Sequence, residues 1–224
     1  LDIPIASSNF LDEFNGGSLD TTKWSYIIPP NGSVIVAGGE VTLAANDTNG
    51  YPIVWSMPGI TFPYDPSIGW TLEWTMRYPN ITGYGVFFRV CDLQNDAAIV
   101  AIKANTADGY TVEMPDGTVR ESLGSHTTSD SYELVYTPPT NTAAGQYELK
   151  RNTASKGTMA STSRQAWFIA IGNSAIQTGI GTWTTIAVSR VDVNLNSTES
   201  QTWPQWTDRE QDDDGIWWGR LPWI

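Results

Sequence analysis

Hydrophobic and polar residues alternate along much of the chain, with the period of a β-strand. The clearest case is residues 70–78, where large apolar residues take every second position and Thr, Glu or Arg stands between them. A period of two with one apolar face predicts a half-buried antiparallel strand. We expect further strands at 34–37, 41–45, 85–90, 97–103, 110–114, 119–122, 132–136, 146–151, 167–171 and 184–193.

Turn-forming residues separate these runs. Pro115-Asp116-Gly117 lies between two predicted strands, and Gly38-Gly39 separates two others. Glycine accepts the positive φ that tight turns require. No segment has a convincing helical period, so we predict an all-β fold in which two antiparallel sheets form a sandwich or jelly roll.

Residues 10–24 read Phe-Leu-Asp-Glu-Phe-Asn-Gly-Gly-Ser-Leu-Asp-Thr-Thr-Lys-Trp. This stretch resembles the opening strand of concanavalin A-like domains, which is shared by laminarinase-like glucanases and many sugar-binding modules. Residues 70–78, 145–152 and 186–193 resemble the laminin-G-like branch of that superfamily. The resemblance implies a two-sheet jelly roll over 9–194, with an N-terminal arm at 1–8 and a C-terminal tail at 195–224.

The composition changes after Asn194. Segment 197–224 has six acidic residues, two basic residues and five of the eleven tryptophans in the chain, but no strand or helix period. We therefore expect an irregular extension. Disordered tails are poor in aromatic residues, so this one should pack on its own domain or on another protein, including a second copy of the chain. The tryptophans concerned are Trp203, Trp206, Trp217, Trp218 and Trp223.

Composition and charge narrow the classes of partner. The net charge of −12 repels phosphate backbones and anionic lipids, so we expect neither nucleic acid binding nor membrane insertion. Cys91 is the one cysteine, which rules out an internal disulfide and predicts a buried thiol. A low share of charged residues, with many Thr, Ser and Asn, favours an extracellular protein.

The resemblance to laminarinase-like enzymes allows the sequence to be searched for their catalytic residues. Laminarinase-like enzymes carry Glu-x-Asp-x-(x)-Glu on one strand, whereas the corresponding strand here, 96–103, has Ala, Ile and Val inside it. The other strand carboxylates each stand alone in their strand, and the single histidine lies in a loop without a sequence neighbour to activate it. We therefore expect no hydrolase or lyase site. The residues weighed are Glu73, Glu113, Glu133, Glu148 and His126.

These observations favour a non-catalytic extracellular module that binds glycans or mediates adhesion. Aromatic rings stack on the apolar faces of sugars, and the candidate residues in loops are Tyr51, Trp55, Tyr64 and Tyr84. Two alternatives stay open. One is a structural subunit of a virion or extracellular filament that packs through its tail, and the other is a polysaccharide hydrolase or lyase with a non-standard site.

The resemblance also implies a structural calcium ion. Related jelly rolls hold it with a carbonyl near the opening strand, a glycine carbonyl and an aspartate on the last strand. The matching positions are Glu13, Gly39 and Asp192. Calcium prefers such hard oxygen ligands, and an ion held there would join the two ends of the domain.

Overall fold

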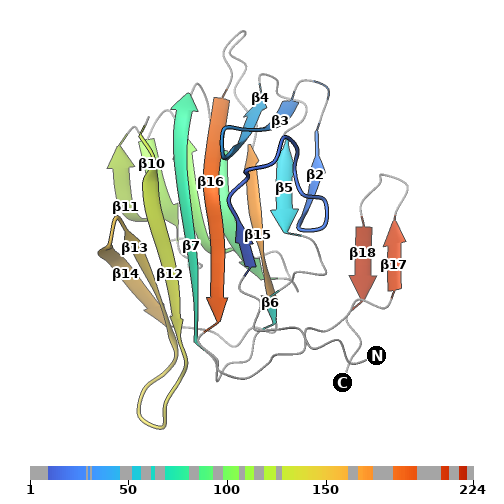
Figure 1. Ribbon diagram of the computed structural model, residues 1–224. Coiled ribbons are helices and arrows are strands. Elements are labelled where there is room, and N and C mark those ends of the chain that lie inside the picture. Colours follow the sequence, from blue (N-terminus) through green and yellow to red (C-terminus); the bar gives the residue numbers. More distant parts are fainter. Residues whose placement is uncertain are drawn as a thin grey trace.

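The fold is all-β, as the alternation predicts. A computed structural model describes residues 10–28, 30, 32–45, 52–56, 62–63, 69–80, 86–92, 98–105, 109–113, 119–124, 128–160, 166–173, 184–195, 208–211 and 217–220. These residues form two large antiparallel sheets that lie one behind the other (Figure 1). None of the described residues belongs to a helix with the length and apolar character needed to cross a lipid bilayer.

Sheet A is the sheet in front in Figure 1. In spatial order it consists of β14 (Ala154–Ala160), β13 (Gln146–Arg151), β12 (Asp130–Thr137), β7 (Trp70–Asn80), β16 (Thr184–Leu195), β4 (Glu40–Ala45) and β3 (Gly32–Ala37). The short strand β1 (Phe10–Asp12) also pairs with β16, beyond the stretch that pairs with β4.

Sheet B lies behind sheet A. In order it consists of β11 (Val119–Gly124), β10 (Gly109–Glu113), β9 (Ala98–Asn105), β8 (Val86–Asp92), β15 (Ala166–Asn173), β5 (Ile53–Ser56) and β2 (Trp24–Ile27), and β6 (Phe62–Pro63) pairs with β15. The chain passes from one sheet to the other at several points, for example between β4 and β5. The two sheets together confirm the sandwich.

The core is formed by the alternating apolar residues of both sheets. In β7 the residues at every second position from Trp70 to Tyr78 are almost fully buried, as the period of two predicts. Trp74 stacks on Phe88 of sheet B with ring centroids 4.5 Å apart. Trp70 packs against Trp167 at 4.6 Å. Aromatic side chains therefore fill the space between the sheets.

Each strand expected from the alternation is present, with ends shifted by up to a few residues. Four strands of the sandwich were not expected from the sequence: β2, β5, β6 and β14. Gly38 and Gly39 form the expected turn between β3 and β4, with φ of 62° and 79°. The turn proposed at 115–117 lies outside the described residues.

The opening motif joins the two sheets. Asp12, at the end of β1 in sheet A, accepts a 2.7 Å hydrogen bond from the Trp24 indole, which begins β2 in sheet B. The second Asp12 oxygen accepts a 2.8 Å bond from the Phe14 backbone N–H. Phe10 and Phe14 pack against the Trp24 ring at 5.5 and 5.8 Å.

The tail is not wholly irregular, which corrects the sequence expectation. Strands β17 (Asp208–Gln211) and β18 (Trp217–Arg220) pair with each other as an antiparallel hairpin. Four residues per strand are too few for the alternation to be recognised in an acidic, Trp-rich segment. Trp217 and Trp218 belong to β18, while Trp203, Trp206 and Trp223 lie outside the described residues, as does the arm at 1–8. The domain boundaries at 9 and 194 stay predictions.

Candidate functional site

The outer face of sheet B, which points away from the core, carries a sequence-predicted site residue. In β5, Val54 is fully buried in the core, whereas the next residue, Trp55, is half-buried on the opposite side. In β8, Phe88 and Val90 are fully buried in the core and Arg89 lies between them. Because side chains alternate along a strand, Trp55 and Arg89 share the outer face.

Strand pairing places these residues in one row across the sheet. Trp55 pairs with Ala170, which pairs with Arg89, which in turn pairs with Ala101. Trp55 and Arg89 are therefore two strand spacings apart, about 9–10 Å. We call this the Trp55–Arg89 row, and it consists of Ser25, Trp55, Ala170, Arg89, Ala101 and Glu113.

Small residues flank the arginine. Ala101 and Ala170 are 1% and 8% exposed, although they stand on the outer face. Gly172 follows on β15 at the next outward position and is also buried. Of these small residues, Ala170 is the one that stands between the indole and the guanidinium group.

The combination of residues suits a sugar polymer. An indole ring stacks on the apolar face of a sugar, and a guanidinium group binds carboxylates or hydroxyls through several donors in a fixed plane. Arg89 is half-buried, which restricts its motion and limits competition from water. Among the side chains that the structure describes on the outer face of sheet B, Arg89 is the one that carries a charge. The row can therefore bind a polar ring and orient an anionic substituent.

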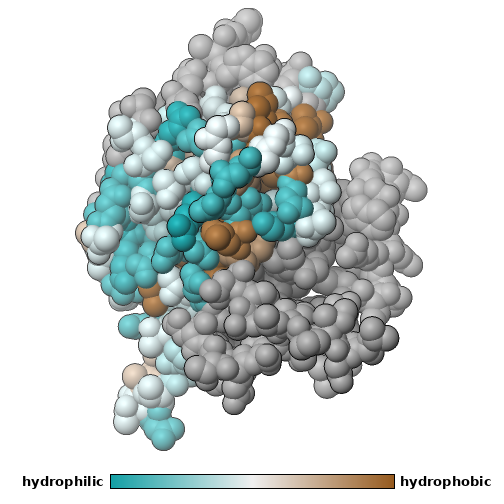
Figure 2. Space-filling view, in the orientation of Figure 1, coloured by the Kyte–Doolittle hydropathy of each residue, from teal (hydrophilic) through white to brown (hydrophobic). Residues whose placement is uncertain are grey.

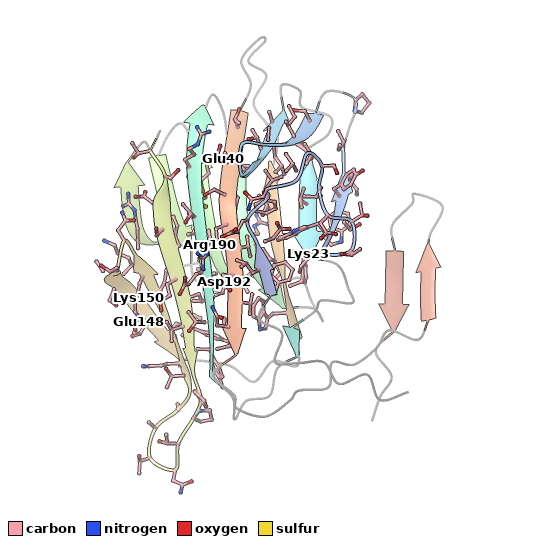
Figure 3. The ribbon with its side chains drawn as sticks, viewed as in Figure 1. Lys23, Glu40, Glu148, Lys150, Arg190 and Asp192 are labelled. Atoms are coloured by element: carbon pink, nitrogen blue, oxygen red, sulfur yellow. The ribbon has the colours of Figure 1, made fainter. Side chains whose placement is uncertain are left out.

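The outer face of sheet A has a different character. Six of its charged side chains form three ion pairs: Arg77 with Glu40, Lys150 with Glu133, and Arg190 with Asp192. Figure 3 labels Arg190 and Asp192 near the middle of this face, with Lys150 on β13 to one side. The hydrogen bonds that Arg77 donates to Glu40 keep the pKa of that carboxyl below its ordinary value. A face covered by such ion pairs is typical of an ordinary surface in contact with water.

Strand order brings carboxylates of different strands together on this face. Glu73 and Glu133 each stand alone on their strand, but they pair directly across β7 and β12, and Asp192 pairs with Glu73 from β16. A search for carboxylates within one strand misses such neighbours, because strand order is not visible in the sequence. Two of the three carboxylates have an ion-pair partner: Lys150 Nζ lies 3.2 Å from Glu133, and Arg190 pairs with Asp192. The row therefore has the ion-pair pattern of a stabilised surface.

The expected calcium ligands come near one another. A Cβ built on Gly39 would lie 3.8 Å from the Glu13 carbonyl oxygen. The Asp192 carboxylate accepts a hydrogen bond from Arg190, and the pKa of that guanidinium is raised chiefly by Asp192, with smaller contributions from Glu73 and Glu13. Within the described part of the chain, no group of three or more His, Cys, Asp or Glu side chains could hold a metal ion. Gly39 therefore lies beside the Glu13 carbonyl, whereas the Asp192 carboxylate is bound to Arg190.

The structure describes some of the other candidate residues and leaves the rest outside its described ranges. Trp55 lies in β5 rather than in a loop, which corrects its assignment, and Cys91 is buried as expected. Tyr51, Tyr64, Tyr84 and His126 lie outside the described residues. The residue missed by sequence reasoning is Arg89. The sequence does contain a signal for Arg89, because a charged residue there interrupts the apolar run of β8. Arg89 and Trp55 are far apart in the sequence, however, so the sequence does not reveal that they lie close together.

The resemblance matches β9 to the strand that holds the catalytic carboxylates in laminarinase-like enzymes. Val100 and Ile102 face the core, and Ala101 stands in the Trp55–Arg89 row. Lys103 pairs with Phe87 two positions further on. The motif that the resemblance would require is therefore absent from this strand, as the sequence indicates.

No family model and no curated protein matches the sequence. Solved structures do match. An endo-1,3-β-glucanase from Streptomyces sioyaensis superimposes with a TM-score of 0.64 at 13% identity, over 84% of this chain and 95% of that one. The chain has the concanavalin A-like jelly-roll fold. An endo-β-1,3-glucanase from Pyrococcus furiosus gives 0.61 at 12% identity, over 83% and 93% of the two chains.

An alginate lyase from Corynebacterium sp. also superimposes, with a TM-score of 0.58 at 15% identity, over 79% of this chain and 96% of that one. Identities this low establish the fold that the jelly roll shares with these proteins. The named neighbours are nevertheless polysaccharide-cleaving enzymes, and this finding contradicts our expectation of a non-catalytic module. That expectation relied on one missing motif, whereas alginate lyases and glucanases place different chemistry on the same sheets.

Proposed function

We propose that this jelly roll is a polysaccharide-cleaving enzyme whose substrate lies across the outer face of sheet B. The observation that carries the proposal is the Trp55–Arg89 row, in which an indole and a guanidinium flank a buried alanine. Enzymes that cleave polysaccharides on this fold, among them those from Streptomyces sioyaensis and Corynebacterium sp., support it. Since such polymers are too large to enter cells, we also propose an extracellular site of action.

Elimination fits the described residues better than hydrolysis does. Retaining hydrolases need two carboxyl groups about 5–5.5 Å apart, and the Trp55–Arg89 row has one carboxylate position, Glu113. Elimination from a uronate needs a cation that neutralises the sugar carboxylate. Arg89 stands at the centre of the row and can supply that charge. The reaction we propose is therefore that of a lyase.

In this reaction a base removes the proton from the ring carbon that bears the carboxylate. The neighbouring carbon–oxygen bond to the leaving sugar breaks, its oxygen receives a proton, and a carbon–carbon double bond remains. Negative charge builds up on the carboxylate in the transition state. Arg89 would stabilise that charge through donors that are already oriented, and Trp55 would hold the ring in register by stacking.

The net charge of −12 opposes an anionic substrate at long range, but contact interactions outweigh it. At physiological ionic strength, charges more than about 8 Å apart are largely screened. A hydrogen bond to a charged group contributes about 1.5–3 kcal/mol to binding once the substrate is in contact with the protein. The guanidinium can make two of them with one carboxylate. The local cation therefore decides binding, while the global charge slows the encounter.

A product assay tests the proposal. The purified chain is incubated with alginate, pectate and a β-1,3-glucan, and both reducing ends and ultraviolet absorbance are followed. A lyase releases reducing ends together with the absorbance of the unsaturated uronate. Reducing ends without that absorbance would make the enzyme a hydrolase, and no cleavage of any acidic or neutral polymer would overturn the proposal.

We also propose the calcium ion that the resemblance implies, held by the Glu13 and Gly39 carbonyls and by Asp192. Saturation at 100 times the dissociation constant stabilises a protein by about 2.7 kcal/mol, which corresponds to about 5–10 °C in Tm for a chain of this length. Thermal melting with calcium and with chelator measures it. Asp192→Asn should abolish the shift, whereas Glu148→Gln on the same outer face should keep it. Equal Tm values in both buffers would contradict the site.

A further inference from the structure

The two sheets of the sandwich have edges of two kinds. At one side the edge strands are β14 and β11, and both contain charged residues: Lys156 in β14, and Arg120 and Glu121 in β11. Their pairing with the neighbouring strands is also interrupted by register shifts. Charges and bulges on edge strands prevent pairing with other chains. This side of the sandwich is protected.

The opposite edge, formed by β2 and β3, lacks this protection. The sequences Trp-Ser-Tyr-Ile and Gly-Ser-Val-Ile-Val-Ala contain no charged residue, and their pairing with β5 and β4 runs without a register shift. Exposed large hydrophobic residues concentrate here. Of the five among the described residues, four belong to this edge: Tyr26, Ile27, Ile28 and Ile35. We call these two strands and Ile28 the β2–β3 edge.

Figure 2 shows hydrophobic surface at the upper right, where β3 and β4 lie, beside a mostly polar face over β12, β7 and β16. Ile35 of β3 is 55% exposed, and Tyr26, Ile27 and Ile28 are 44–45% exposed. An apolar edge with unpaired backbone groups is a template for a further strand. The β2–β3 edge therefore needs a partner that supplies backbone donors and acceptors together with apolar contact.

The tail hairpin, formed by β17 and β18, also lacks a sheet to pair with. Strands β17 and β18 form a two-stranded sheet that pairs with neither sheet A nor sheet B. An isolated two-stranded hairpin is marginally stable in water and needs further strands or packing. Each of its strands has four residues, as β2 does. Its eight strand residues include two acidic, two basic and two tryptophan residues, so the strands themselves carry no net charge, although the sequence between them contains Asp212, Asp213 and Asp214.

We infer that the β17–β18 hairpin of one copy adds to the β2–β3 edge of a second copy, so that the chain assembles through its tail. Pairing with β2 would extend sheet B by two strands and cover the exposed apolar residues of the edge. The hairpin forms no strand pairing with either sheet of its own chain, which favours another copy as its partner. This contact is independent of the polysaccharide reaction.

Light scattering of the full chain and of two kinds of variant tests the inference. The full chain should have at least twice the single-chain mass of 24.6 kDa. Deleting 196–224 should give the mass of a single shortened chain, and so should Ile27→Lys combined with Ile35→Lys in the full chain. The matched control is Leu11→Lys, since Leu11 is 42% exposed but lies on β1, and it should leave assembly unchanged.

Mixing the two defective variants distinguishes the hairpin from simple pairing of two edges. The deleted chain keeps an intact edge, and the Ile27→Lys, Ile35→Lys chain keeps an intact hairpin. Together they should form a one-to-one complex that neither forms alone. If they stay separate, or if the edge variant still assembles, the inference is wrong. A full chain that is monomeric would also overturn it. Circular dichroism on each variant confirms that the sandwich has folded.

Discussion

Replacing Arg89 by alanine is expected to lower kcat/KM on an acidic polysaccharide by about 10²–10³-fold, the usual cost of removing one donor to a developing charge. Arg89 stands in the middle of the Trp55–Arg89 row, between two buried alanines. No large neighbour in the row could take its place. The loss should fall on kcat more than on KM, because the carboxylate gains its extra charge in the transition state.

Arg89→Lys is the conservative variant for the same experiment. Lysine keeps the charge but loses the planar pair of donors, so activity should be intermediate between wild type and Arg89→Ala. Trp55→Ala should instead raise KM and change kcat little, since stacking acts on substrate and transition state alike. A neutral β-glucan, if it is cleaved at all, should be nearly insensitive to Arg89→Ala.

Arg77→Ala is the matched control, because Arg77 is an arginine at mid-strand on the outer face of sheet A, paired with Glu40. It should lower stability slightly and leave kcat/KM unchanged. If Arg77→Ala and Arg89→Ala reduce activity equally, the effect comes from folding and the assignment of the site to sheet B is wrong. If Arg89→Ala keeps full activity, the guanidinium has no part in the reaction.

The sequence predicts the sandwich well because its strongest signal is local. Alternation in 70–78 identifies β7 and its buried face, and Gly38-Gly39 identifies the turn into β4, without knowledge of which strands are neighbours. Strands that are short or lie at an edge were missed. β2 has four residues, two of which are exposed apolar residues, so its pattern does not alternate.

The candidate site could not be predicted in the same way. Trp55 and Arg89 lie in one row, on either side of Ala170, only because β15, which comes much later in the chain, lies between β5 and β8. The pairing of Glu73 with Glu133 and Asp192 depends on strand order for the same reason. Residue type and spacing within one strand could exclude the laminarinase-like motif but could not find chemistry assembled from several strands.

The opening motif, by contrast, was recognised from sequence without its physical reason, which the structure supplies. Asp12 is 8% exposed and accepts bonds from two buried donors, the Phe14 N–H and the Trp24 indole. Phe14 has a φ of 51°, a left-handed conformation that costs an aromatic residue roughly 1–2 kcal/mol. The hydrogen bond that the Phe14 N–H donates to Asp12 holds Phe14 in that conformation. One carboxylate thus fixes both the turn and the indole that joins sheet A to sheet B.

Asp12→Ala is therefore expected to lower the free energy of unfolding by about 3 kcal/mol, the range found when one member of a buried charged pair or network is removed. The substitution leaves the Trp24 N–H without its acceptor at a position that is 1% exposed. It also removes the acceptor of the Phe14 N–H. Urea unfolding followed by tryptophan fluorescence and circular dichroism measures the change, and Asp20→Ala in the exposed loop after β1 is the control.

A double-mutant cycle separates this bond from the rest of the loss. Trp24→Phe keeps an aromatic ring between Phe10 and Phe14 but removes the indole N–H, so Asp12 loses one of its two donors. In that background, Asp12→Ala should cost about 1–2 kcal/mol less than in the wild type, since the interaction energy of directly bonded groups is of this size. Additive losses would mean that the Trp24 bond contributes nothing, and that Asp12 stabilises the domain through the Phe14 turn alone.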